Sequence, residues 1–579
     1  MKKGVIGLLL MACVFASCRN DAYDPNYNPE LGARVPDNFD WSTTKALTVN
    51  VDVNDEYNGK YYYAVRVYDK APGEGVLPVA ASGKVNKDLP FSQKIVVPAT
   101  VTKLYIVQAF KNADASEVTT KKEVAIDGES LTCSFGHSST MRSVSTRGNE
   151  QSIIVENGKV IDITSVKEKF QQYTVKEGGT LNFKVGGELF QWEITIEDGG
   201  KMTAANGTKL DMKNSDLINY GEVHIYDIEF DNGSIFQNGN AMTGKNEGGC
   251  FYAHNLILNN GNGNGSDKRE LGERSYTSCE TLTLVNNKLT LKTSAWLKCG
   301  KLIATQGGAC TLQGEGATIG DTEYTGLATI EKIVIESKLT VGKNILVECD
   351  ESDLKQDNIV EDASDMITII GTACNDGGFG NNEEHELGTY TYIIEDMYPT
   401  QGDYDMNDIV VSLTATQKED ALTIKGQLKA VGAAYKIIPY IEVAGQTQPL
   451  ISTPTGNPLE AHFILTKNET SDIPINTVIG QPFYPAQSFE LEFDNVKEGL
   501  NIDDIDFYIT ANDTKIHWNM YSQEEKATWG MRIPGSDFRW PQEKVSITKA
   551  YPSFSKWFED KSYPWYNDHK DLNLIYNQQ

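Results

Sequence analysis

The chain has 579 residues and a formal charge of −28 at pH 7, from 52 basic and 80 acidic residues. Because nucleic-acid binding depends on Lys and Arg contacts to phosphate, so acidic a chain excludes nucleic acid as a partner. Its length predicts several domains, roughly three or four. The negative charge suits a soluble protein that works outside the cytoplasm with bound cations.

The N-terminus has the pattern of a secretion signal over residues 1–17. Two lysines precede a short apolar stretch at 4–16, which is too short to span a membrane. Small residues before Cys18 resemble the lipobox of bacterial lipoproteins, so we expect Cys18 to be acylated and to anchor the protein to the outer membrane. Cleavage near Ser17 in an ordinary secreted protein is the alternative. Residues 18–36 then form a polar tether, and its acidic residues favour exposure on the cell surface.

The first domain is expected over residues 37–137. Residues 47–53 alternate between apolar and polar types, and 61–68 and 103–109 are further candidate strands. Several short strands in so short a segment predict a small antiparallel β-sandwich. A stretch rich in Ser, Thr, Arg and Gly at 138–151 is the expected linker.

Residues 152–348 have a different texture, with frequent Gly and Asn and very short candidate strands. A turn with Gly or Asn is followed by a few alternating residues, and this plan recurs roughly every 15 to 25 residues. Such recurrence predicts a β-solenoid-like domain, in which each coil buries its apolar residues by stacking on the next. A second sandwich with long loops is the alternative.

Cysteine usage fits an interior role. Removing Cys13 and Cys18 from the nine cysteines leaves seven (9 − 2), so at least one is free or paired between chains. The absence of a close C-x-x-C pair argues against zinc. Cys279, Cys299 and Cys310 fit ladder positions inside the solenoid better than bridges.

The most distinctive stretch crowds oxygen-bearing side chains between residues 395 and 408. Alternate residues of an extended chain share a side, so Asp403, Asp405 and Asn407 can converge on one point. Ca²⁺ takes six to eight oxygen ligands at a flexible site, which makes it the expected cofactor, in a structural role. The expected ligands are Asp403, Asp405, Asn407 and Asp408, with Glu395 or Asp396 from the preceding segment.

An acidic stretch of this kind has two other interpretations. An EF-hand is excluded, because Asp408 stands where that loop requires Gly and strand-like residues follow instead of a helix. A solvated acidic turn before a strand is the remaining alternative.

The same stretch carries a family resemblance. The run from Glu395 to Val411, with Gly402-Asp403-Tyr404-Asp405 at its centre, resembles the signature of LruC-type domains of lipoproteins from Bacteroides and relatives. A second block at 516–557, which includes Glu543, agrees with it. The resemblance covers about residues 370–560 and implies a β-sandwich-like domain with a calcium site. We therefore expect a LruC-like calcium-binding β domain over 349–579, with a short helix at 553–559. One departure is the segment 505–509, where the family usually has an Asn-Pro-Phe-Ile-like sequence.

Catalytic signatures are missing from the sequence. Gly-x-Ser-x-Gly, P-loop and His-Glu-x-x-His motifs are absent, and the seven histidines are scattered. The sequence therefore predicts an all-β, multidomain, non-enzymatic envelope lipoprotein with a structural or adhesive role. A glycan or another envelope protein is the expected partner. A glycan-binding surface lipoprotein is the first alternative, and a solenoid polysaccharide lyase is the second. The glycan hypothesis rests on the C-terminal aromatic residues Trp540, Tyr551, Phe554, Trp557, Trp565 and Tyr566.

Overall fold

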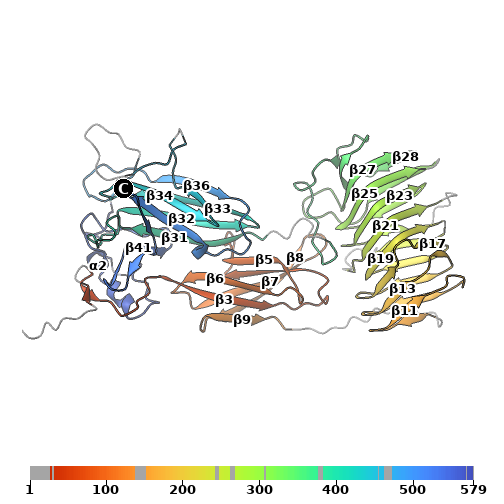
Figure 1. Cartoon of the computed structure of the whole chain (residues 1–579), viewed down its shortest axis with the longest axis horizontal. Coiled ribbons are helices and arrows are strands. Elements are labelled where there is room, and N and C mark those ends of the chain that lie inside the picture. Colours follow the sequence, from red (N-terminus) through yellow and green to blue (C-terminus); the bar gives the residue numbers. More distant parts are fainter. Residues whose placement is uncertain are drawn as a thin grey trace, which may run out of the picture.

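The structure is a computed structural model. It describes residues 27–28, 31–136, 152–231, 233–240, 247–260, 268–305, 308–375, 383–453, 456–461, 473–568 and 570–577. Within these ranges the chain is almost entirely β, and its helices are α2 (Ile547–Ala550), η1 (Ile502–Asp504) and η2 (Phe554–Phe558). Three β bodies lie in a row (Figure 1). The expected all-β, multidomain fold is confirmed.

The first body is a small sandwich of two sheets, and it lies between the other two (Figure 1). One sheet has the order β6 (Phe91–Pro98), β3 (Thr44–Asp52), β9 (Ser130–Ser134). The other has the order β5 (Ala80–Val85), β4 (Tyr63–Tyr68), β7 (Lys103–Lys111), β8 (Glu117–Ala125). Alternation along β3 places Leu47, Val49 and Val51 in the core between the sheets.

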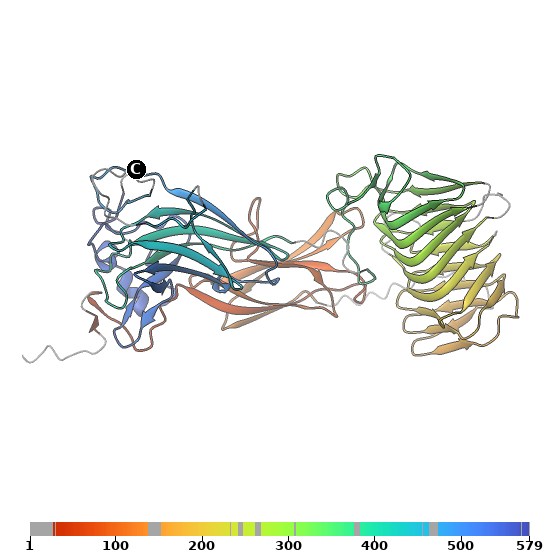
Figure 2. The ribbon, with the colours of Figure 1, turned by 45° about the horizontal axis from the view of Figure 1, so that its top comes forward.

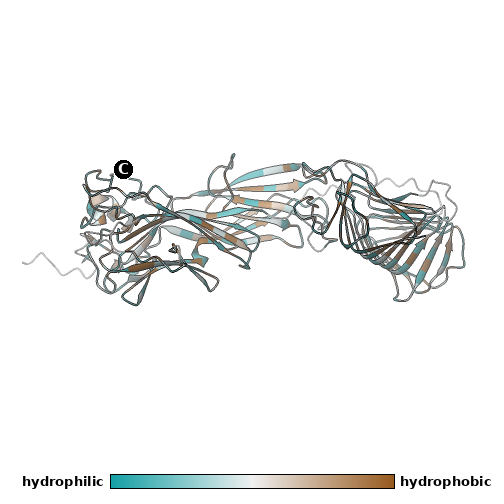
Figure 3. Cartoon of the chain, turned by 90° about the horizontal axis from the view of Figure 1, so that it is seen from above, coloured by the Kyte–Doolittle hydropathy of each residue, from teal (hydrophilic) through white to brown (hydrophobic). Residues whose placement is uncertain are grey.

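The second body is built from parallel coils, the stacking that defines a β-solenoid. Its nine-stranded sheet contains β10 (Ile153–Val155), β12 (Gln172–Val175), β15 (Glu193–Ile196), β18 (Asp216–Asn219), β20 (Ile235–Asn238), β22 (Arg269–Leu271), β24 (Lys288–Leu291), β26 (Ala309–Gly314) and β28 (Lys338–Val341). Its twelve-stranded sheet contains β11 (Val160–Ile163), β13 (Thr180–Phe183), β14 (Gly187–Phe190), β16 (Lys201–Ala204), β17 (Lys209–Lys213), β19 (Glu222–Phe230), β21 (Cys250–Asn259), β23 (Tyr276–Val285), β25 (Ala295–Thr305), β27 (Gly326–Ile335), β29 (Ile345–Glu351) and β30 (Ile359–Val360). Apolar and polar residues alternate along these strands (Figure 3), so one side of each coil faces the shared core.

The cysteines of the solenoid lie at interior positions, as the sequence predicts. Cys279 and Cys299 are ladder partners on β23 and β25, and both are buried free thiols, as is Cys310. Among the described cysteines one disulfide forms, between Cys250 on β21 and Cys374 beyond the last coil.

The solenoid extends past its expected end at 348. β29 continues to Glu351, and β30 pairs with it in the same sheet. Ile367, Ile369 and Cys374 then pack against solenoid side chains in one buried cluster. The boundary predicted at 349 is corrected accordingly, because the apolar residues after it cover the end of the solenoid.

The third body is an antiparallel sandwich. Its five-stranded sheet has the order β36 (Gln487–Phe493), β33 (Ala421–Ala430), β32 (Ile409–Lys418), β31 (His385–Ile394), β41 (Gly530–Pro534). Its four-stranded sheet has the order β35 (Gln446–Pro449), β34 (Ile437–Val443), β37 (Ile505–Ala511), β38 (Thr514–His517). A hairpin of β39 (Tyr521–Ser522) and β40 (Ala527–Thr528) lies apart from both sheets. The short helix expected at 553–559 corresponds to η2.

The N-terminal segment packs on this third body rather than forming a tether. β1 (Tyr27–Asn28) pairs with β2 (Ala33–Arg34), and the red segment lies beside the blue C-terminal chain (Figure 2). Leu31, Val35, Phe39 and Trp41 are buried in the core of the third body. The tether prediction is therefore wrong for residues 31–36. Residues 37–41, expected in the first domain, also belong to the third, because burial of these apolar side chains outweighs their nearness in sequence to β3.

The first sandwich also contacts the solenoid. The hydroxyl of Tyr61 accepts a 2.8 Å hydrogen bond from the N–H of Gly248. The guanidinium of Arg274 lies 4.1 Å above the Tyr61 ring and donates a 2.8 Å hydrogen bond to the carbonyl of Lys111. These buried contacts fix one end of the sandwich against the coils.

Candidate metal centre

The predicted ligands lie where two central strands of the third body meet. β31 and β32 are antiparallel neighbours, with Ile394 opposite Ile409. The segment between them, residues 395–408, therefore leaves one strand end and returns to the adjacent one. The segment therefore brings acidic residues from both of its ends together at one end of these two strands.

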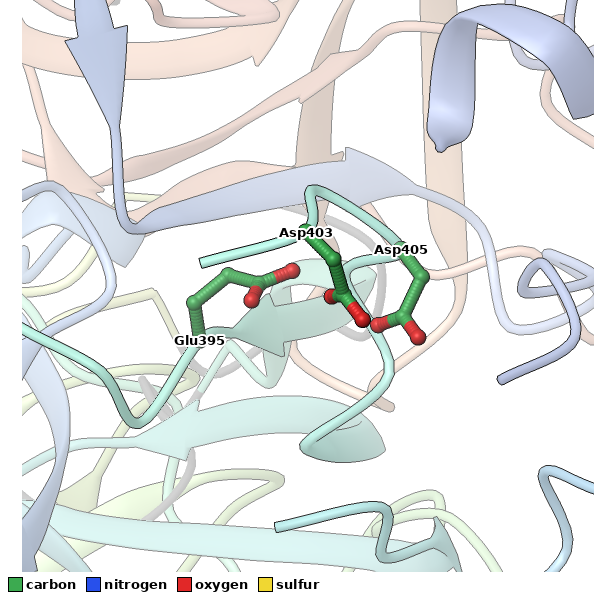
Figure 4. A group of neighbouring side chains, drawn as sticks. All are labelled: Glu395, Asp403 and Asp405. Carbon is green, nitrogen blue, oxygen red and sulfur yellow. The ribbon is translucent and has the colours of Figure 1, made fainter. Parts of the chain in front are cut away.

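Three of the predicted ligands converge. Glu395, Asp403 and Asp405 each place one carboxylate oxygen within 4.8 Å of those of the other two, and the three side chains face a common space (Figure 4). Glu395 and Asp405 are buried, whereas Asp403 is exposed. A compact, all-oxygen, anionic donor set is what Ca²⁺ and other hard cations prefer.

The backbone of the loop is curled rather than extended. Gly402, Tyr404 and Met406 have φ angles of 66°, 56° and 54°, so every second residue is left-handed. The expectation of an extended chain is wrong, although alternate side chains still share a side. Burial of the Tyr404 and Met406 side chains in the core holds this costly backbone in place. The side chains of Asp403 and Asp405 therefore lie together on the other side of the loop (Figure 4).

Hydrogen bonds hold two of the three carboxylates, those of Glu395 and Asp405, in position. Oε1 of Glu395 accepts from the N–H of Met406 at 2.5 Å, which links the strand end to the loop. Oδ2 of Asp405 accepts from the N–H of Lys544 at 2.7 Å. A Cβ added at Gly402 would lie 2.8 Å from Oε2 of Glu395, so this position has little room for a side chain.

The other predicted ligands form a neighbouring group. Oδ2 of Asp408 accepts a 2.6 Å hydrogen bond from the N–H of Asp396, and Oδ2 of Asp396 accepts one of 2.8 Å from the N–H of Tyr435. The amide nitrogen of Asn407 donates to the carbonyl of Pro541 at 3.1 Å. Oδ1 of Asp396 and Oδ1 of Asn407 are buried and receive no hydrogen bond from the residues that the structure describes.

The acidic groups perturb one another strongly. Burial, and then the charges of Asp408, Asp405 and Asp403, raise the pKa of Glu395 well above its usual range. Burial and the charge of Asp403 raise the pKa of Asp405 to about 8. Burial and the charge of Asp396 raise the pKa of Asp408. Crowded, buried carboxylates favour either a proton or a cation in the same space.

One acidic residue of this centre was missed by the ligand prediction. Glu543 is more than half buried, and burial together with the charges of Asp403 and Asp396 raises its pKa. Its Oε2 accepts a 3.2 Å hydrogen bond from the hydroxyl of Thr477. The only signal in the sequence was its membership of the second block, since nothing local connects it to the loop.

The predicted signal at 1–17, the lipidation residue Cys18 and the predicted linker at 138–151 lie outside the described residues. Within the described part of the chain, no helix is long and apolar enough to cross a membrane. The predicted anchor at Cys18 stays a prediction.

Comparisons with known proteins add a partial family match. A family model described as a domain of unknown function (DUF4842) matches residues 465–566, which include Glu543 but not the loop at 395–408. No curated protein matches the chain. The matching family is not the LruC type, so that resemblance stays a prediction.

A solved structure was also matched. It is a Bacteroides ovatus protein provisionally named a lipoprotein, 16% identical, with a TM-score of 0.24, covering 34% of this chain and 76% of that one. A score this low supports no inference about this chain.

Proposed function

We propose that the protein is a non-enzymatic, lipid-anchored protein of the outer membrane, structural or adhesive, whose third domain is stabilised by Ca²⁺. The convergence of Glu395, Asp403 and Asp405 carries the proposal. Among the described residues none of the three forms a salt bridge, so a bound cation would neutralise charge that no basic side chain of the chain pairs with. The orphaned, buried Oδ1 of Asn407 nearby is a further oxygen donor without a partner.

Ca²⁺ fits this donor set better than Mg²⁺. The site combines carboxylates of unequal burial on a strand end and an irregular loop, and Ca²⁺ accepts such variable geometry. Mg²⁺ requires a near-ideal octahedron at shorter distances. The role of the ion is structural, because it would join the end of β31 to the loop that leads into β32.

The packing of the N-terminal segment indicates how the protein would be oriented relative to the membrane. Leu31, Val35, Phe39 and Trp41 are buried in the third body, so a lipid on Cys18 would hold that body near the membrane. The solenoid lies at the opposite end of the row (Figure 1). In this arrangement the calcium-binding domain lies nearest the membrane and the solenoid lies farthest from it.

Glycan binding is the second candidate function. The aromatic side chains that favour it lie on the solenoid, not on the third body. The six C-terminal aromatic residues are buried, so they offer no exposed platform. On β19 and β21, however, His224 stacks on Tyr252 and Tyr226 on His254, each with ring centroids 4.5 Å apart. These four rings line a hollow of about 220 Å³. A glycan array with wild type and Tyr226→Ala/Tyr252→Ala tests this candidate, and equal binding by both would reject it.

Titration calorimetry on the full mature chain tests the calcium proposal. The wild type should bind Ca²⁺, and Asp403→Ala/Asp405→Ala should lose that binding. Asp420→Ala/Glu498→Ala is the matched control, because both of its acids are exposed and distant from the loop. The full chain is needed because a fragment limited to residues 349–579 would lack four side chains of the core of the third body, those of Leu31, Val35, Phe39 and Trp41. Equal binding by wild type and the loop variant would reject the proposal.

The anchor is tested separately. Cys18→Ala should abolish acylation and release the chain in soluble form. A variant that still partitions into detergent with the wild type would contradict the anchor.

A further inference from the structure

The two ends of the solenoid differ. At the C-terminal end, β30 extends the larger sheet beyond β29, and Leu354 and Ile359 pack against the core of the coils. At the N-terminal end, β10 and β11 are the outermost strands, and within the described residues each has a strand neighbour on one side only. Both ribbon views show this first coil, residues 152–171, at the end of the stack (Figure 1, Figure 2). Stacked repeats need terminal caps with a polar outer face to stay soluble, so the outer face of this coil decides whether it is a cap.

The outward positions of the first coil are apolar where the coils that follow are polar. Ile154 pairs with Thr174 in the next coil. Val160 begins a ladder that continues with Thr180 and then Lys201. Ile154 is 50% exposed and Val160 is 64% exposed. At ladder positions that otherwise face water, the first coil therefore carries side chains suited to a buried surface.

Two more apolar side chains widen this exposed area. Ile153 is exposed, whereas Tyr173, its ladder partner in the next coil, is buried. Phe170, just before β12, is also exposed. We call Ile153, Ile154, Val160 and Phe170 the end patch. Four exposed apolar side chains on one coil mark an interaction surface rather than a cap.

The charges of the first coil do not oppose pairing with a copy of itself. Residues 152–171 contain three acidic and three basic residues, a net charge of zero (3 − 3) in a chain of −28. All six are exposed: Glu156, Asp162 and Glu168 are acidic, and Lys159, Lys167 and Lys169 are basic. Because both signs occur on the same rim, two copies can place acidic side chains against basic ones. The self-repulsion expected of so acidic a chain is therefore weak at this end.

We propose that two copies of this protein pair through the first coils of their solenoids, with β10 and β11 of one against β10 and β11 of the other. A partner that satisfies both edges must present two strands with the same separation as the two walls of this coil. The first coil of a second copy does so. Contact through the same surface on both copies gives a closed pair with a two-fold axis. The covered C-terminal end disfavours a head-to-tail chain. This inference goes beyond the proposed function and does not depend on the calcium site.

Analytical ultracentrifugation of the full mature chain tests the pairing. Cys18→Ala serves as the parent, so that no lipid drives association. The parent should sediment with twice the mass of one chain. Adding Ile154→Lys/Val160→Lys should give the mass of one chain, because like charges would then meet across the pair. Val118→Lys is the matched control, since Val118 is an exposed valine on β8, an edge strand of the first sandwich, and this variant should still pair.

Hydrogen exchange locates the contact and separates it from other ways of covering the patch. Amides of residues 153–155 and 160–163 should exchange more slowly in the parent than in Ile154→Lys/Val160→Lys. Both substitutions are at exposed positions, and circular dichroism checks that the variant is folded. A parent that sediments as a single chain overturns the proposal, and slow exchange in such a single chain would assign the patch to a segment of the same chain. A pair that persists in the double variant, or species that keep growing with concentration, would also overturn it.

Discussion

The backbone N–H of Met406 donates a 2.5 Å hydrogen bond to Oε1 of Glu395. The acceptor ends a central strand, and the donor belongs to the loop that carries Asp403 and Asp405. This bond fixes the distance between the two sources of ligands before any ion arrives. Preorganisation of this kind lowers the entropy lost when a ligand binds.

Gly402→Ala should weaken calcium binding. The position is left-handed at φ 66°, and the new Cβ would press on Oε2 of Glu395 at 2.8 Å. Gly445→Ala is a matched control, because Gly445 is also left-handed, at φ 82°, but has open space around it. Both variants should lose about 1 kcal/mol of stability from backbone strain. Only Gly402→Ala should also raise the calcium Kd in calorimetry, and an equal Kd for the two would contradict the crowding argument.

Without calcium, the stability of the third domain should fall as pH rises. Asp405 has a pKa of about 8 in the fold, raised by burial and by Asp403, against about 3.9 in an unfolded chain. Between these values the folded state holds a proton that the unfolded state has released, so the free energy of unfolding declines with rising pH and the contribution is gone above pH 8.

Thermal melts in chelator at pH 5 and pH 9 check this. The wild type should melt lower at pH 9, and Asp405→Asn, which cannot titrate, should lose much of that difference. Saturating Ca²⁺ should also reduce it, because the ion replaces the proton. The same pH dependence in wild type and Asp405→Asn would contradict the assignment.

Trp41→Ala should destabilise the third domain although Trp41 lies more than 300 residues before it. Its side chain is 5% exposed and packs edge-to-face on Phe39 and Phe558. Truncating a buried Trp costs about 3–5 kcal/mol. Phe170→Ala is the control, since Phe170 is 69% exposed on the solenoid. Limited proteolysis should cut the third domain faster in Trp41→Ala only, and unchanged cleavage would show that the segment is not part of that core.

Loss of the Cys250–Cys374 disulfide should loosen the end of the solenoid. The bond joins positions 124 residues apart, and a crosslink over such a span contributes about 4–5 kcal/mol in the chain-entropy model. Cys250→Ala/Cys374→Ala should therefore lower the melting temperature of the solenoid. Cys133→Ala, a free buried cysteine of the first sandwich, should not affect that transition. An unchanged solenoid melt in the double variant would contradict a structural role for the bond.

Local patterns in the sequence were sufficient for the strands. Alternation in residues 47–53 and the Gly- and Asn-rich turns of the solenoid reflect neighbours a few residues apart, so they indicate β3 and the parallel coils directly. Ladder positions for Cys279 and Cys299 follow from the same regular repeat.

Contacts between segments that are distant in the sequence could not be predicted from such local patterns. Leu31 and Val35 look like isolated apolar residues in a polar stretch, and only the folded third domain supplies the surface that buries them. Glu543 joins the acidic centre from far along the chain for the same reason. The curl of the loop at Tyr404 and Met406 was missed because non-glycine residues rarely adopt left-handed backbone without tertiary support.

Calorimetry of the full mature chain in Ca²⁺, in Mg²⁺ and in chelator tests the central claim most directly. Free Ca²⁺ at a hundredfold over its Kd adds about 2.7 kcal/mol to the stability of the domain that binds it. The transition of the third domain should therefore lie several degrees higher in Ca²⁺ than in chelator, with Mg²⁺ close to chelator. One and the same transition temperature in all three buffers would contradict the account and leave the loop at 403–408 as an acidic turn.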